Sequence, residues 1–455
     1  MASFLFFYLL FSSSFLLFAC VISQPPLNHL EQESVYSVLE SINSETPWRS
    51  LFPDDLCSSA PHGVVCDYFT DQTGAVSAHI IELNFGYVSD YSPNPSCSSS
   101  ATLDAFLFSS FTHLKKLFFY QCFVETNVIF PDFSSLGASL EYLVFVENPS
   151  LVGSLSGKIS SLTSLRRLVI TGTSVSGQIP DEFSHLINLE QLTLSRNKFS
   201  GNVSVNFEKI KKLKVLDLSQ NGFEGYVPES IGNGLNELLK LDLSFNQFSG
   251  KIPENLKGLQ RLKFLDLSYN RFGNFGVPLF LGEMPNLKEV YLSGNLLGGK
   301  IPEMWEKLGG ILGIGLSGTG LVGNIPASMG VYLRNTCYLA LDNNSLEGTV
   351  PEEFSLLESV SELNLENNNL TGKVPFSAKF VGKMGDKLKL EGNSELCIDE
   401  ELRNAKVGQK LGQLKICKKP DIPQFALLQG SASSSQHLSA SHFLICIGIL
   451  IVLSL

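Results

Sequence analysis

Several features that would indicate catalysis, nucleic-acid binding or a metal centre are scarce in this 455-residue sequence. No two cysteines have the C-x-x-C spacing of a zinc site, and the seven histidines are scattered without metal-ligand spacing. No G-x-S-x-G motif marks a hydrolase nucleophile. The net charge of −11 argues against a nucleic-acid-binding surface, which is usually basic. We therefore expect no enzyme activity, no cofactor, no metal and no nucleic-acid partner.

The chain instead contains one phrase that returns at a nearly fixed interval. The phrase reads LEQLTLSRN (189–197), LKVLDLSQN (213–221), LLKLDLSFN (238–246), LKFLDLSYN (262–270) and LKEVYLSGN (287–295). Successive final asparagines are separated by 24, 25, 24 and 25 residues, and the frame extends back to Asn148 and forward to Asn393. A fixed period in this range is the signature of leucine-rich repeats.

Each unit is predicted to form one coil of a solenoid. The inner L-x-L alternates with period two, which predicts a short strand with both leucines on one face. Stacked strands form a parallel sheet over one continuous apolar core. The asparagine amide can bond backbone groups where the chain leaves the strand, and glycine permits the bend that follows. We predict an α/β-type solenoid that is curved, with a parallel concave sheet and a mostly irregular or 3-10 convex side.

Caps are expected at both ends, because an open end would expose the leucine core. Residues 111–393 hold about eleven repeats. Residues 24–110 form the N-terminal cap, with a short amphipathic helix over 31–42, and residues 394–417 form the C-terminal cap. Cysteines flank the array, and we pair Cys57 with Cys66, Cys97 with Cys122 and Cys397 with Cys417, which leaves Cys337 unpaired.

Two stretches imitate phosphate-binding loops. GTGLVG (318–323) spells G-x-G-x-x-G, and GNLLGGK (294–300) begins like a P-loop. Their glycines occupy the repeat position of Gly250 in FSGKIP, and Ile301 stands where a P-loop needs a hydroxyl. Neither stretch follows a strand and opens the helix of a βαβ unit. Both are therefore assigned to the repeat scaffold.

The N-terminus and several asparagines indicate export. Residues 1–23 read as a secretory signal, whose apolar run is too short for a membrane span. An oxidising compartment permits the disulfides. N-x-S/T sequons at Asn202, Asn343 and Asn369 are candidate glycosylation sites.

The C-terminus carries a second targeting pattern. Residues 418–442 form a linker that ends in a small, polar stretch, and residues 443–455 are apolar to the last position. This order is typical of a GPI-anchor signal, with Ser431 or Ser433 as the attachment residue. The alternative is a short membrane tail or a merely apolar end. We expect a protein on the outer face of the plasma membrane, held by a lipid.

The repeat form L-x-x-L-x-L-x-x-N-x-L-x-G-x-I-P resembles that of plant extracellular leucine-rich repeat proteins. HGVVCD (62–67) is similar to the G-V-x-C part of their N-terminal cap motif W-x-G-V-x-C. FSAKFVGKMGDKLKLEGNSELC (376–397) and PSCSSS (95–100) resemble the Piriformospora indica-insensitive protein 2 group of receptor-like proteins. The resemblance implies a role at the plasma membrane in signalling or in responses to microbes, and it supplies no ligand.

Strand alternation indicates which side chains face the concave surface. In L-x-x-L-x-L-x-x-N the fourth and sixth residues point into the core, and the third, fifth and seventh point outward. This arrangement gathers aromatic side chains, carboxylates and Lys240 on successive coils. The candidate partner-binding residues are Phe245, Phe264, Tyr269, Tyr291, Asp242 and Asp266. Exposed aromatic residues at the centre of a concave face are typical of binding hot spots.

Two alternatives remain beside this hypothesis. L-D-L-S is common in such repeats, so Asp217, Asp242 and Asp266 fit a scaffold role better than a binding role. Arg166, Arg167 and Arg196 form a basic cluster on earlier coils. That cluster either contacts an acidic partner or oligogalacturonide or is a solvated face, and we favour the solvated face.

The pattern as a whole favours a non-enzymatic recognition protein of the cell surface. Without a cytoplasmic segment it would signal through a partner, most plausibly a receptor kinase. Its ligand would be an extracellular protein or peptide bound on the concave face. The alternative is a secreted inhibitor of a cell-wall hydrolase, similar to polygalacturonase inhibitors.

Overall fold

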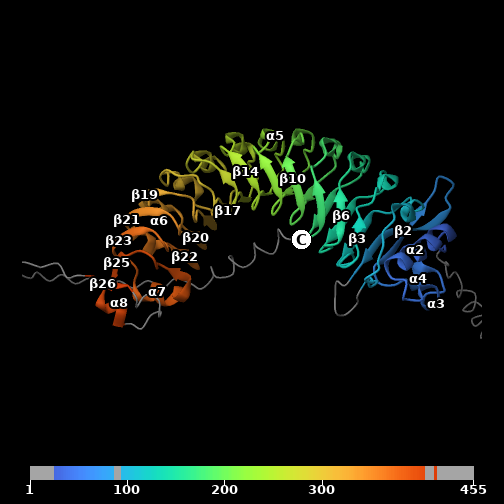
Figure 1. The fold of residues 1–455 in the computed structure, drawn as a ribbon, viewed down its shortest axis with the longest axis horizontal. Helices are drawn as coiled ribbons and strands as arrows, with labels where there is room; N and C mark the ends of the chain where they lie inside the picture. Colours follow the sequence, from blue (N-terminus) through green and yellow to red (C-terminus); the bar gives the residue numbers. More distant parts are fainter. Residues whose placement is uncertain (1–24, 87–93, 405–413, 418–455) are drawn as a thin grey trace, which may run out of the picture.

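The computed structural model describes residues 25–86, 94–404 and 414–417. The expected leader (1–23), the anchor residues Ser431 and Ser433 and the apolar tail (443–455) lie outside the described residues. Within the described ranges, no helix has both the length and the apolar character needed to cross a bilayer. The coils stack side by side into an open arch (Figure 1).

The inner side of the arch is formed by one sheet of 14 strands. It begins with an antiparallel hairpin of β1 (Val64–Thr70) and β2 (Val76–Phe85). Every later strand is parallel to its neighbours and comes from the next coil. These strands are β3 (Lys116–Tyr120), β5 (Tyr142–Val146), β7 (Arg167–Thr171), β9 (Gln191–Thr193), β11 (Val215–Asp217), β13 (Lys240–Asp242), β15 (Phe264–Asp266), β17 (Glu289–Tyr291), β18 (Gly313–Gly315), β20 (Tyr338–Ala340), β22 (Glu362–Asn364) and β24 (Leu388–Lys389).

The core runs the length of the stack because residues at the same repeat position pack side by side in successive coils. Leu216, Leu241 and Leu265 are adjacent in register and fully buried. A second internal row is aromatic: the Phe223 ring lies 6.0 Å from that of Phe199 and 6.3 Å from that of Phe248. The curved leucine-rich repeat solenoid predicted from the sequence is confirmed.

The repeated asparagine joins each coil to the coil before it. The Asn246 side-chain amide donates to the Leu218 carbonyl at 2.9 Å, and its oxygen accepts from the Phe223 N–H at 3.0 Å. Asn270 and Asn295 make the corresponding bonds one and two coils later. The ladder satisfies backbone groups that leave the strand without a sheet partner.

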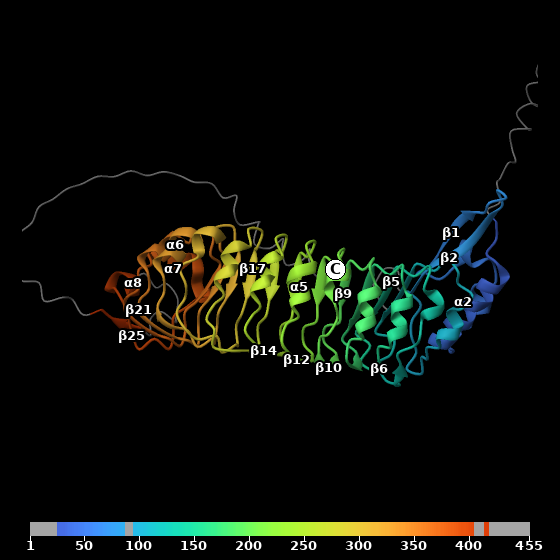
Figure 2. The ribbon, with the colours of Figure 1, turned by 90° about the horizontal axis from the view of Figure 1, so that it is seen from above.

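A second layer of sheet, which the sequence analysis did not predict, lies along one flank (Figure 2). One part has seven strands, namely β4 (Val128–Ile129), β6 (Leu151–Ser154), β8 (Ser174–Gly177), β10 (Lys198–Asn202), β12 (Gly222–Gly225), β14 (Gln247–Gly250) and β16 (Arg271–Phe272). Another has five, namely β19 (Val322–Asn324), β21 (Ser345–Thr349), β23 (Asn369–Lys373), β25 (Glu395–Ile398) and β26 (Lys415–Ile416). These strands are too short for their alternation to be distinguished from a turn.

The two flanking sheets are separated where one repeat departs from the pattern. FGNFGVP (272–278) holds one residue more than FSGKIP (248–253) between the phenylalanine and the proline. Gly276 there has φ 76°, a conformation that favours glycine. The interruption leaves Phe275 64% exposed on this side of the molecule.

Short helical turns form the outer side of the arch, as expected (Figure 1). They are η1 (Ala105–Phe108), η2 (Ser134–Leu136), η3 (Gly157–Ser161), η4 (Asp181–His185), η5 (Phe207–Lys209), α5 (Glu229–Gly234), η6 (Glu254–Gly258), η7 (Leu279–Glu283), η8 (Trp305–Leu308), α6 (Ala327–Tyr332), η9 (Glu352–Leu356), α7 (Ala378–Met384), η10 (Gly385–Lys387) and α8 (Glu400–Asn404). Many begin directly after the proline of the repeat, whose fixed φ suits the first turn of a helix.

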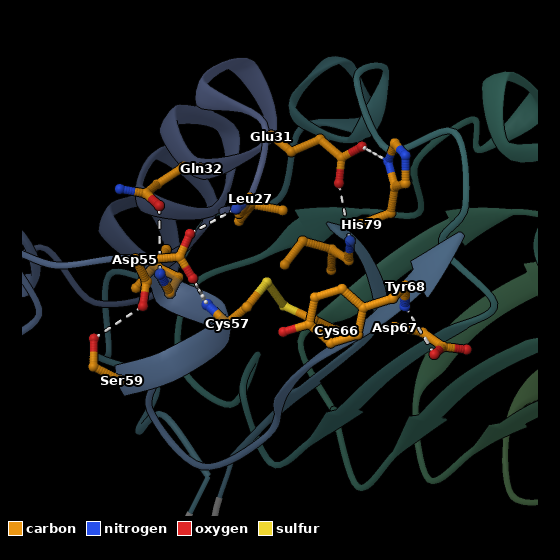
Figure 3. The surroundings of a disulfide bond; sticks show 12 residues. Leu27, Glu31, Gln32, Asp55, Cys57, Ser59, Cys66, Asp67, Tyr68 and His79 are labelled. Carbon is orange, nitrogen blue, oxygen red and sulfur yellow. Dashed lines mark hydrogen bonds and ion pairs between the residues drawn. A yellow bond between two sulfur atoms is a disulfide. The ribbon is translucent and has the colours of Figure 1, made fainter. Parts of the chain in front are cut away.

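The N-terminal cap covers the first coil with α2 (His29–Ile42), α3 (Trp48–Leu51) and α4 (Leu56–Ser59). Asn28 caps α2 by accepting from the Leu30 N–H. A disulfide between Cys57 and Cys66 ties α4 to β1 (Figure 3), with 5.5 Å between the two Cα atoms.

The other two expected disulfides are also present, between Cys97 and Cys122 and between Cys397 and Cys417. The expectation that Cys337 is unpaired is wrong, because it is disulfide-bonded. The prediction counted only the seven cysteines between the expected leader and the apolar tail, and an odd count leaves one residue over.

Candidate functional site

The predicted interface residues Asp242, Phe264, Asp266 and Tyr291 lie on β13, β15 and β17, in the middle of the concave sheet. The ring centroids of Phe264 and Tyr291 are 5.8 Å apart, and those of Tyr291 and Tyr338 are 6.1 Å apart. We name these three half-buried aromatic residues, Phe264, Tyr291 and Tyr338, the tyrosine row. Tyr338 was missed from the sequence, although it occupies the outward-facing third position of its repeat.

Strand β18 has only glycines at its concave-face positions, and this lets the Tyr291 ring lie across the strand. β18 places Gly313 and Gly315 at the third and fifth positions, between β17 and β20. A methyl group on Gly315 would lie 2.8 Å from Cδ1 of Tyr291, and one on Gly313 would lie 2.7 Å from its hydroxyl oxygen. The ring therefore needs both glycines. The phrase LGIGL (312–316) carries this signal in the sequence.

The Tyr291 hydroxyl is held as a hydrogen-bond donor. It donates to Oε2 of the buried Glu289 at 2.9 Å. Burial, the Glu289 charge and this hydrogen bond raise the pKa of Tyr291 far above its ordinary value. The phenol therefore stays protonated, and its ring orientation is fixed before any partner arrives.

Lys240 lies between two aspartates beside the tyrosine row. Its Nζ is 3.0 Å from Oδ2 of Asp217 and 3.6 Å from Oδ2 of Asp242. The ammonium also lies 5.2 Å from the centroid of Phe264, a cation–π contact. Burial lowers the pKa of Lys240, but Asp217 and Asp242 outweigh it and the pKa is raised overall.

Asp217 and Asp242 each bond a serine of their own coil, which fits the scaffold role favoured from the sequence. Oδ1 of Asp217 accepts from the N–H and the hydroxyl of Ser219, and Asp242 does the same with Ser244. Burial, with Asp217 and Asp266 nearby, raises the pKa of Asp242 to about 6, against the opposing effect of Lys240. Burial also raises the pKa of Asp266.

Phe245 and Tyr269 form a separate, exposed pair at the edge of the sheet. Their rings stack with centroids 4.4 Å apart and planes 18° apart. Phe245 is 48% exposed and Tyr269 is 52% exposed. Both occupy the eighth repeat position, where φ is 53°. The sequence analysis grouped all four aromatic residues, whereas the structure places them in two neighbouring clusters.

Two of the three arginines of the basic cluster form ion pairs with carboxylates. Arg196 forms an ion pair with Glu147, and Arg166 with Glu190 at 2.6 Å. The Arg167 guanidinium lies 5.9 Å from the Tyr142 ring centroid. The ion pairs favour the solvated-face interpretation for Arg166 and Arg196 over an anion-binding site.

The three sequon asparagines are exposed. Asn202 ends β10 and Asn369 begins β23, so both lie on the flanking sheets. Asn343 lies at the eighth repeat position, and its amide bonds Asp342 and Asn367 at 2.5 and 2.9 Å. Glycosylation of these residues stays a prediction.

The repeat geometry agrees with matches to known families. Leucine rich repeat family models match residues 211–272 and 286–308. The fold and the asparagine ladder agree with these matches, and together they define the architecture as a leucine-rich repeat solenoid.

Its sequence is similar to plant receptor-like proteins. Receptor like protein 29 of Arabidopsis thaliana is 35% identical over 176 residues, covering 37% of this chain and 35% of that protein. Piriformospora indica-insensitive protein 2 of the same plant is 34% identical over 151 residues, covering 32% and 34%. The matches thus span about a third of the length of these relatives.

Solved structures of plant receptor ectodomains have the same fold. The Arabidopsis receptor kinase HAESA ectodomain, in complex with an IDA peptide hormone, has a TM-score of 0.56 at 27% identity, covering 66% of this chain and 48% of that one. The plant peptide hormone receptor RGFR1, in complex with RGF2, has a TM-score of 0.54 at 25% identity, covering 66% and 51%.

Proposed function

We propose that this chain is a non-enzymatic recognition protein of the cell surface, whose concave face binds an extracellular protein or peptide. The observation that carries the proposal is the tyrosine row with the exposed Phe245–Tyr269 pair beside it. Large aromatic surface at the centre of a concave sheet is where binding hot spots concentrate. The similarity to peptide-hormone receptor ectodomains supports the same assignment.

The row is suited to binding because little of it has to be ordered. Tyr291 is fixed by Glu289 and by the glycine strand, and Phe264 is held between Tyr291 and Lys240. A rigid aromatic surface binds without losing side-chain entropy. A partner that places an apolar side chain on Phe264 and Tyr291 therefore keeps most of the burial energy.

The proposal extends to how the protein would act. A chain held on the outer face of the membrane by a lipid would need a membrane-spanning partner, and a receptor kinase would carry its signal across the membrane. HAESA has been solved with the peptide hormone IDA and the co-receptor SERK1 bound together. Signalling or a response to microbes is the role that we infer for this chain.

Chemical cross-linking at the surface of plant cells tests the proposal. The tagged full chain should capture an extracellular partner, and the Phe264→Ala and Tyr291→Ala variants should lose it. Phe275→Ala is the matched control, because this exposed phenylalanine lies off the concave face. Equal capture by all variants would place the site elsewhere. Capture of a secreted cell-wall hydrolase with no receptor kinase would favour an inhibitor.

A further inference from the structure

Three side chains with metal-binding chemistry meet in the N-terminal cap. Glu31 comes from α2, His79 from β2 and His113 from the loop between η1 and β3. Their candidate ligand atoms all lie within 4.8 Å of one another. Glu31 is only 4% exposed, although carboxylates are rarely buried without a charged partner. The three residues are far apart in the sequence, so no spacing motif reveals them.

Hydrogen bonds hold the Glu31 and His79 side chains in place. Oε2 of Glu31 accepts from the Ile80 N–H at 2.9 Å, and Oε1 lies 2.6 Å from Nδ1 of His79 (Figure 3). Nε2 of His79 lies 2.9 Å from the Ser77 hydroxyl oxygen. Supporting bonds of this kind orient the ligands in most protein metal sites.

The ring of His113 stacks against the ring of His79. The His79 and His113 centroids are 4.0 Å apart, and Phe69 covers His113 at 4.3 Å. Nδ1 of His113 contacts the Thr112 hydroxyl at 2.9 Å, which makes Nε2 the nitrogen available to a ligand. Burial, His79 and Lys115 lower the pKa of His113 against the opposing charge of Glu31. A neutral imidazole is the form that binds a metal.

We propose that Glu31, His79 and His113 form a binding site for a divalent transition-metal ion, with Zn²⁺ as the best match. One carboxylate oxygen and two imidazole nitrogens are a common ligand set for zinc, and water completes the tetrahedron. Cu²⁺ uses the same donors and competes for them. This site is independent of the concave face.

Binding requires a small rearrangement that the fold permits. Zinc–ligand distances of about 2.0–2.2 Å require Glu31 and His79 to separate slightly and His113 to move closer. Both histidines are only partly buried, so their rings can adjust. The ion would take Nδ1 of His79 in place of the Glu31 contact, and Nε2 would then carry the ring proton and donate to the Ser77 hydroxyl oxygen.

The consequence would be structural. The ion would join the cap helix, the cap hairpin and the loop before the first repeat strand. The Cys57–Cys66 disulfide joins α4 to β1. In the described part of the cap, no disulfide joins α2 to the rest. A zinc ion would therefore stabilise the part of the cap that covers the first coil.

Zinc titration of the purified full chain by isothermal calorimetry tests the proposal. His113→Gln removes one ligand and leaves the Glu31–His79 bond intact, whereas His185→Gln changes an exposed histidine on η4 and is the control. We expect one site per chain that His113→Gln weakens by about tenfold or more, since losing even a residue that only orients a ligand costs roughly that much. Equal affinity in the wild type and His113→Gln would overturn the proposal.

A spectroscopic measurement needs no variant. Co²⁺ in a four-coordinate site absorbs visible light much more strongly than Co²⁺ in water. We expect such absorption from one Co²⁺ per chain, removed by one equivalent of Zn²⁺ and unaffected by excess Mg²⁺. Absence of the absorption at saturating Co²⁺ would equally overturn the proposal, whatever the stability of the variants.

Discussion

Replacing Asn246 with alanine should remove one complete step of the asparagine ladder. The amide donates to the carbonyls of Leu218, Leu243 and Ser244 at 2.9, 3.2 and 3.1 Å. Its oxygen accepts from the Phe223 N–H at 3.0 Å. The asparagine is 8% exposed, so water does not readily take its place.

The expected loss follows from which groups keep a partner. The Leu218 carbonyl still accepts from Asn221 at 3.1 Å, and the Leu243 carbonyl from Asn270 at 2.9 Å. The Phe223 N–H loses the hydrogen bond to Asn246. A buried donor without a partner costs about 1–3 kcal/mol, and the weakened carbonyls add about 1 kcal/mol. We therefore expect Asn246→Ala to lower the free energy of unfolding by about 2–4 kcal/mol.

Denaturant unfolding followed by tryptophan fluorescence measures this loss, and hydrogen exchange at the Phe223 amide localises it. Asn286→Ala is the control, because Asn286 is exposed and donates only to the Gln260 carbonyl at 2.8 Å. Asn246→Thr should fall between them, since Thr319 at the same repeat position donates to the Leu316 carbonyl. A loss for Asn246→Ala no larger than for Asn286→Ala would refute the ladder as a source of stability.

Three further predictions concern pH, the cap and the anchor. Burial raises the pKa of Asp242 from 3.8 to about 6, so between these pH values the folded state keeps a proton that the unfolded state has lost. The free energy of unfolding should therefore fall as pH rises from 3.8 to about 6, and it should fall less steeply in Asp242→Asn. Identical pH profiles for the two proteins would contradict this. Cys57→Ser should destabilise the N-terminal cap by about 2–5 kcal/mol, and an unchanged thermal midpoint would show that the disulfide is dispensable. Phosphatidylinositol-specific phospholipase should release the protein from intact cells. Retention after a verified digestion, with residues 443–455 still present by mass spectrometry, would exclude the lipid anchor.

The parts of the fold that depend on repetition were predictable. The leucine and asparagine positions follow from a period that needs no tertiary information, and the helix expected over 31–42 corresponds to α2 (His29–Ile42). The flanking sheets were missed because strands of two to five residues are too short to show period-two alternation clearly. Their pairing comes from stacking, which a single repeat does not encode.

The site was predicted at the level of strands and less well at the level of side chains. Alternation placed Phe264 and Tyr291 on the concave face, but it gave no reason to expect Tyr291 to lie across the glycine strand. Arg166 pairs with Glu190 of the next coil, and Arg196 pairs with Glu147 two coils earlier. Glu31, His79 and His113 meet only because the cap folds onto the first coil, and no local spacing reports that contact.

The affinity of a captured partner for four purified chains tests the central claim most directly: wild type, Phe264→Ala, Tyr291→Ala and Phe275→Ala. Truncating a hot spot costs about 2 kcal/mol or more, or roughly thirtyfold in affinity. We expect losses of this size for Phe264→Ala and Tyr291→Ala, and none for Phe275→Ala, with all variants secreted and melting normally. Wild-type affinity in both concave-face variants would contradict the account.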